Sequence, residues 1–259
     1  MAAMATEGPS PRKILVPIDF YGVSRASLET LVSIARQLDR GVLGLLLDDL
    51  RLQHVADLPF TTEIVLHGGE ERSLLREQLS RRHSLVSTDS GRLLKELASR
   101  DQVDLVLEHV AGNRLHAALA HDVGLDIFFP ARQRWQQLSA RPAPQSKAIA
   151  RLGLVLARTS QDNAVVETAR MLQKSGLVGE TYVISSGALD RKLLDSLYQP
   201  GGRICVQANL HRDPATIGKL VRQSPYDLLL LPRDCLQGIA PEALEAALDK
   251  ASGQVLVIN

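Results

Sequence analysis

Short apolar runs alternate along the whole chain with segments of helical periodicity. The runs KILVPI from Lys13, GVLGLLL from Gly41 and VDLVLEHV from Val103 are continuous, as in strands that are covered on both faces of a parallel sheet. Between the first two runs, apolar residues recur at helical spacing over 28–38, with Ser24 placed as the N-cap. The alternation predicts strand–helix–strand units and therefore an α/β protein.

The same alternation extends to the end of the first half. Composition predicts a helix over 70–83, the run SLVS at 84–87 predicts a third strand, and apolar spacing predicts a second helix over 90–100. After the VDLVLEHV strand, we expect a short helix over 115–120 and a closing strand DIFF at 126–129, stopped by Pro130.

A connector separates this half from a second one that repeats its order. SARPAPQSK, at 139–147, has two prolines, polar residues and no periodicity. Strands and helices then alternate again, and the halves align as KILVPI with RLGLVL, VDLVLEHV with YDLLLLP, and DIFF with QVLVI. Internal repetition of this kind predicts two copies of one structural unit.

These boundaries divide the chain into four parts. We expect a disordered tail over 1–12, a first domain over 13–138, a linker over 139–150 and a shorter second domain over 151–259. Because strands that alternate with helices require right-handed crossovers, each domain is predicted to be a doubly wound, Rossmann-like parallel sheet with helices on both faces.

Composition excludes several classes of partner. Thirty Lys and Arg residues against 29 Asp and Glu residues give a formal charge of +1, so no global field favours nucleic acid or anionic lipid. The chain has only two cysteines, Cys205 and Cys235, and lacks both an apolar signal segment and an 18-residue apolar run. We therefore expect a cytoplasmic protein that does not cross a membrane.

The opening of the chain resembles a known family. ILVPIDF, followed by an apolar-faced helix that ends in SIARQLDRGVLGLLLDD, is similar to the start of the universal stress protein domain, and the repeat makes the chain resemble a tandem pair. The resemblance implies five parallel strands in the order 3-2-1-4-5 in each half. It also implies that the last strands, 126–129 and 254–258, pair back to back, which would make the chain an internal pseudo-dimer.

ATP-binding members of that family carry the loop G-x-x-G, nine residues, then G with Ser or Thr. Glycines there let backbone amides approach phosphate groups. In the first half Gly112 stands alone, with Leu115 in the place of the second glycine, and the loop is short. In the second half Pro232 removes an amide and only Gly238 remains. We therefore expect no cofactor and disfavour ATP.

Asp19 is the one ligand-related position of the family that the chain retains. It follows the first strand, where open α/β sheets bind ligands, and the resemblance implies a place near the adenosine part of a nucleotide. Its counterpart in the second half is Ala157. The alternative, which we favour, is an aspartate that caps the next helix.

Other polar residues are weaker candidates. Asp48 and Asp49 end the second strand and are interpreted as solvated acids rather than cation ligands. His116 and His121 are five residues apart, off one helical face, so no metal site is expected. Cys235 lies beside Arg233, where a lowered thiol pKa is conceivable, but we favour an ordinary buried thiol, and packing for Cys205.

A basic segment precedes the connector and contains the only tryptophan. Arg132, Arg134, Trp135 and Arg141 are typical of a protein-docking site, and packing onto the neighbouring domain explains them equally well. Common nucleophile, phosphate and zinc motifs are absent from the sequence.

These features leave three functions to compare. We favour a non-enzymatic stress-response or regulatory protein that acts through contacts with an unknown protein partner or as a homodimer. The alternative is a sensor of a small molecule or nucleotide bound near Asp19. An enzyme, for which weak ATP hydrolysis is the activity to assay, would need catalytic residues that we cannot assemble from the sequence.

Overall fold

A computed structural model describes most of the chain. The described residues are 12–19, 22–48, 54–55, 57–58, 61–64, 69–73, 76–121, 124–131, 149–187, 191–198, 203–208 and 210–259. Most of the predicted tail, Asp49, the basic segment with Trp135 and most of the predicted linker lie outside them. The last two residues of that linker belong to a strand that begins at Ile149, and the division into domains stays a prediction.

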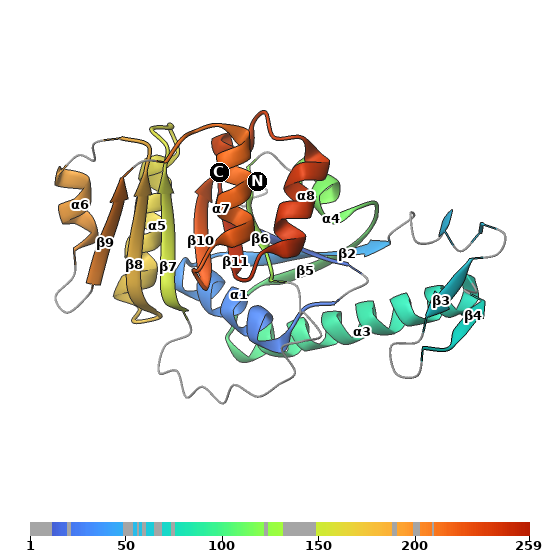
Figure 1. Cartoon of the computed structure of the whole chain (residues 1–259). Helices are drawn as coiled ribbons and strands as arrows, with labels where there is room; N and C mark the ends of the chain where they lie inside the picture. The colour runs from blue at the N-terminus through green and yellow to red at the C-terminus, as the bar shows by residue number, and fades with distance from the viewer. Residues whose placement is uncertain are drawn as a thin grey trace, which may run out of the picture.

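Strands and helices alternate through both halves (Figure 1). The first half contains β1 (Lys13–Ile18), α1 (Arg25–Gln37), β2 (Gly41–Asp48), β3 (Thr62–Ile64), β4 (Glu71–Ser73), α3 (Arg76–Arg100), β5 (Leu105–Ala111), α4 (Arg114–His121) and β6 (Asp126–Phe129). The second contains β7 (Ile149–Leu156), α5 (Asp162–Lys174), β8 (Val178–Ser185), α6 (Arg191–Leu197), β9 (Arg203–Ala208), α7 (Pro214–Gln223), β10 (Leu228–Pro232), the 3₁₀ helix η2 (Arg233–Leu236), α8 (Pro241–Lys250) and β11 (Gln254–Ile258).

Nine of these strands form one continuous sheet, in the order β5-β2-β1-β6-β11-β10-β7-β8-β9. The prediction of two separate five-stranded sheets is therefore wrong. The last strands, β6 and β11, do pair as the resemblance implies, antiparallel with Phe128 opposite Leu256, and this pairing joins the strands of both halves into one sheet. Backbone hydrogen bonding thus continues from one half into the other and covers two edges that separate sheets would leave open.

The described part of the first half contributes four strands to this sheet instead of five. The expected strand at 84–87 lies inside α3, one uninterrupted helix over 76–100. A run of four residues such as SLVS is compatible with either structure, and the surrounding helical segments decide the outcome. In consequence β5 is the outermost strand, beside β2, and β6 lies directly against β1.

The alignment of VDLVLEHV with YDLLLLP is therefore wrong as well. In the second half, β10 lies between β7 and β11, next to the first strand of that half. In the first half, β5 lies at the far edge, which is the position that β9 occupies in the second half. Among the described residues, the first half has no strand in the place of β10.

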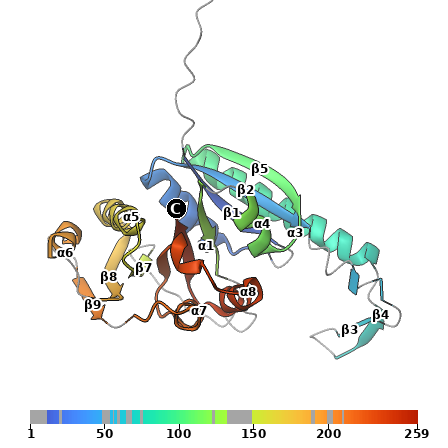
Figure 2. The ribbon, with the colours of Figure 1, turned by 90° about the horizontal axis from the view of Figure 1, so that it is seen from above.

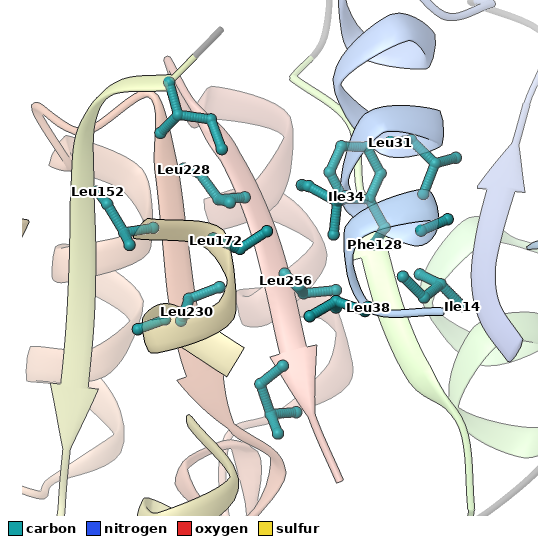
Figure 3. Packing of buried hydrophobic residues seen from close by; sticks show 14 of the residues in the cluster. Ile14, Leu31, Ile34, Leu38, Phe128, Leu152, Leu172, Leu228, Leu230 and Leu256 are labelled. Carbon is teal, nitrogen blue, oxygen red and sulfur yellow. The ribbon is translucent and has the colours of Figure 1, made fainter. Parts of the chain in front are cut away.

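Helices cover the sheet on two faces, and each face has a core that both halves share. On one face α1 and α3 pack beside α5 and α6, while α4 packs with α7 and α8 on the other. Figure 3 shows Ile34 and Phe128 of the first half on one side of the first core, with Leu256 of the second half on the other. In the part of the chain that the structure describes, no helix combines the length and hydropathy needed to cross a bilayer.

Polar contacts add to the connection between the halves. The Asp126 carboxylate in β6 accepts a hydrogen bond from the backbone N–H of Asn259, after β11, at 3.0 Å, and it also pairs with Arg40. Burial lowers the pKa of Arg40. On the opposite face, Arg233 Nη2 donates to the Leu119 carbonyl of α4 at 3.1 Å. Both halves are thus fixed to each other by backbone, apolar and charged contacts.

We predict that Phe128→Ala lowers the free energy of unfolding by about 3–5 kcal/mol, because it leaves a cavity in a core that both halves share. Phe128 is fully buried, whereas the Tyr198 side chain, after α6, is 68% exposed. The matched control Tyr198→Ala should change stability by about 0.5 kcal/mol or less. Urea unfolding of the two variants measures the difference, and equal effects would contradict this assignment of the core.

Candidate functional site

Each half contains a topological switch point, the place at the carboxyl ends of the strands where α/β sheets bind ligands. The first switch point lies after β1 and β6, which are neighbours, and the second lies after β7 and β10. In the first half the chain passes from β1 to β2 on one side, and β6, on the other side of β1, comes later in the sequence. In the second half β8 and β10 flank β7 in the same way.

Asp19 lies at the first switch point, directly after β1, and its side chain is half-buried. Its carbonyl accepts a hydrogen bond from Gly22 N at 2.9 Å, and Gly22 has a φ of 69°, which favours glycine in this turn. The N-cap of α1 is Ser24, whose Oγ accepts from Ser27 N at 3.1 Å. Ser24 is thus confirmed as the cap, and the helix-capping interpretation of Asp19 is wrong.

A buried arginine occupies the other side of the first switch point. Arg114 begins α4 and is 4% exposed. Its Nη2 donates to the carbonyl of Pro130, just after β6, at 3.0 Å, and its guanidinium lies 5.3 Å from the centre of the Phe129 ring. No sequence motif singles out this residue, although it is four residues before the buried Ala118 and therefore on the same helix face.

Gly112 does not lie beside Asp19. It follows β5, the outer strand, so β2 separates it from β1. Its N–H donates to the Asp48 carbonyl at 3.0 Å, and its φ of 140° begins a turn into α4. Asn113 Oδ1 then accepts from His116 N at 2.7 Å and caps that helix. Gly112 therefore belongs to a capped turn after the outer strand, and β1, which Asp19 follows, is two strands away.

The backbone at the second switch point is bonded to an aspartate of the chain itself. Asp162 Oδ1 accepts from Ala157 N at 3.3 Å, from Thr159 N at 3.2 Å and from Thr159 Oγ1 at 2.8 Å. Its Oδ2 accepts from Arg158 N at 2.8 Å. Arg158 has a φ of 56°, unusual for a residue with a side chain, and successive amides around such a residue form a concavity that suits an anion. Here that anion is the Asp162 carboxylate.

The loop after β10 is also bonded within the chain. Gln161 Oε1 accepts from the backbone N–H of Asp234 at 3.0 Å, and Pro232 has no N–H to donate. Gly238 follows η2, has a φ of 80° and lies in a turn near Pro214. Because β10 and β7 are neighbours in the sheet, the loop after β10 lies beside the end of β7. The residue that follows β7 is Ala157, whereas the acid Asp19 follows β1 in the first half.

Cys235 lies in η2, at the second switch point, and it is partly buried. Burial raises the pKa of its thiol from 9.0 to about 11, while the charge of Arg212 opposes the shift and the charges of Asp162 and Asp234 add to it. The hypothesis of a lowered thiol pKa is therefore wrong. Cys205, expected to pack inside, is exposed on β9.

His116 and His121, the two histidines that are close in the sequence, have different surroundings on α4. His121 Nε2 lies 2.8 Å from Glu108 Oε2, and His116 is exposed on another side of α4. Within the described ranges of the chain, no group of three potential ligands from His, Cys, Asp and Glu lies close enough to hold a metal ion.

Comparisons with known proteins give a structural similarity. No protein-family model and no curated protein matches the sequence. Among solved structures, the chain is similar to a universal stress protein from Archaeoglobus fulgidus DSM 4304, with a TM-score of 0.48 and 13% sequence identity over 96% of each chain.

We predict that Asp162→Ala lowers the free energy of unfolding by about 2–3 kcal/mol, because it removes four charge-assisted hydrogen bonds from one loop. The control Asp89→Ala removes an exposed aspartate on α3 whose carboxylate pairs with Arg92 at 3.2 Å. It should cost about 0.5 kcal/mol or less, because an exposed ion pair stabilises little. Thermal or urea unfolding compares the two, and a neutral Asp162→Ala would contradict the role of this carboxylate.

We predict that Cys235 resists thiol reagents in the folded protein. In a Cys205→Ser variant at about pH 8, labelling should be at least about 100-fold slower in the native state than in urea, because a raised pKa and burial both reduce the accessible thiolate. The rate should rise about tenfold per pH unit toward pH 11. Fast native labelling near neutral pH would contradict the pKa shift.

Proposed function

We propose that this chain is a non-enzymatic, universal-stress-protein-like regulatory or stress-response protein that acts through protein contacts and not through a bound nucleotide. The sequence resemblance at ILVPIDF and the tandem alternation of strands and helices suggest the family. The strand pairing supports the same choice, because the last strands of the two halves pair antiparallel, as the resemblance implies.

The observation that carries the proposal is the separation of the two features that a nucleotide site of this family combines. The first switch point retains an acid, Asp19, but the glycine-containing loop of that half follows a strand at the far edge of the sheet. At the second switch point the loop after β10 lies beside β7, but the residue that follows β7 is Ala157 and not an acid. Asp162 and Gln161 already accept hydrogen bonds from nearby amides there. A triphosphate would have to displace these bonds.

A second candidate is the small-molecule or nucleotide sensor with its ligand near Asp19. The observation in its favour is that Asp19 is half-buried at the carboxyl end of a central strand and is not the cap of α1. Arg114, buried beside Pro130, adds a cation to the same switch point. The two candidates differ in whether the folded protein binds a small ligand at all.

We predict no saturable binding of ATP, ADP or AMP to the full chain in isothermal titration calorimetry, and no nucleotide released from purified protein on denaturation. ATP hydrolysis should equal that of an Asp19→Ala control, because neither switch point combines the family's acid with available phosphate-binding amides. Saturable binding that Asp19→Ala abolishes would refute the proposal in favour of the sensor. A hydrolysis rate that Asp19→Ala lowers would favour an enzyme.

A further inference from the structure

The N-terminal part of α3 and the β3–β4 hairpin project from the body of the molecule as an arm (Figures 1 and 2). We define the arm by its described residues, 55, 57–58, 61–64, 69–73 and 76–85. Four of the six large apolar side chains that are most exposed among the described residues lie on it: Val55, Leu58, Ile64 and Leu85. Ile64 is the most exposed of these four, at 66%. Exposed apolar side chains on a projecting element indicate a surface for binding a partner.

The hairpin combines an apolar side chain with carboxylates. Ile64 of β3 lies directly opposite Glu71 of β4 in the antiparallel register, so their side chains share one face. Both are exposed, as is the neighbouring Glu70. This arrangement suits a binding surface that offers a small apolar floor bordered by cations.

A groove of that description lies between α7 and α8. Its volume is about 310 Å³, and its lining includes the small residues Ala215, Gly218 and Ala243, which we call its floor. A Cβ built on Gly218 would meet no atom within 4 Å, so the floor is open at this point. Lys219, Arg222 and Lys250 also line the groove, and no carboxylate is among the described residues that do.

The groove cannot receive the hairpin of its own chain in this structure. Both views show β3 and β4 at the far end of α3, away from α7 and α8 (Figures 1 and 2). We propose that the groove binds the β3–β4 hairpin of a second copy of this chain, with Ile64 on the small-residue floor and Glu70 and Glu71 beside Lys219 and Arg222. The two surfaces differ, so the contact is heterologous and closes into a dimer when two copies exchange arms.

This contact goes beyond the proposed function and does not depend on it, since no nucleotide takes part. Opposite charges at its border attract the partner and set its orientation, while the apolar side chain on the floor slows dissociation. Association should therefore weaken as ionic strength rises, because these charges are solvent-exposed and screened by salt.

The test is sedimentation velocity of the full chain over a range of concentrations at low and high ionic strength. We expect self-association that salt weakens, and a loss of at least about tenfold in affinity for Ile64→Ser, for Glu70→Lys with Glu71→Lys, and for Lys219→Glu with Arg222→Glu. Combining the two charge reversals in one chain should restore association, because the pairs are again opposite. The control Lys95→Glu, an exposed residue of α3 outside the arm, should associate like the parent.

Circular dichroism and thermal unfolding establish that each variant is folded, which is expected because all substituted side chains lie on the surface or line the groove. A chain that remains monomeric at every concentration would overturn the proposal. So would association that neither charge reversal weakens, or a combined variant that stays as weak as the single reversals.

Discussion

The structure depends on the antiparallel pairing of β6 with β11. These are the last strands of the two halves, and each would otherwise expose a row of unpaired backbone groups. Their pairing also brings the helices of both halves onto common faces, so that Phe128 and Leu256 belong to one core. Asp126 then receives the N–H of Asn259 and the charge of Arg40 at the end of the same pair of strands. The pairing therefore joins the two halves into one sheet with shared cores.

The same topology decides what the switch points can bind. Since the described part of the first half has no strand in the place of β10, β6 lies against β1 and the Gly112 turn moves to the outer edge. In the second half the order around β7 would suit a ligand, but Asp162 satisfies three backbone amides there. A carboxylate held in this way stabilises the loop and occupies the place that an anion would take. Stability and ligand binding thus compete for one set of amides.

Much of the fold follows from hydrophobic pattern, and the errors have physical causes. Continuous apolar runs located β1, β2 and β7, because a strand buried on both faces needs apolar residues on both. The run at 84–87 predicts the wrong element because four residues are compatible with both a strand and a turn of helix. The position of β5 depends on which strands pair, and residue order alone does not determine pairing.

The candidate site was predictable only in part, for a related reason. Asp19 could be found because it directly follows a strand, whereas Arg114 and Asp162 act through contacts with backbone atoms that no motif records. For Cys235 the favoured interpretation, an ordinary buried thiol, agrees with the structure, where burial outweighs the charge of the nearby arginine and raises the thiol pKa.

Hydrogen exchange of the backbone amides in β6 and β11 tests most directly whether the two halves form one structural unit. The account predicts that these amides exchange only with global unfolding, at the same free energy as the amides of β1, β2, β7 and β8. Exchange in β6 and β11 that is faster than in those central strands, at a lower free energy of opening, would contradict it, because the halves would then separate while each remained folded.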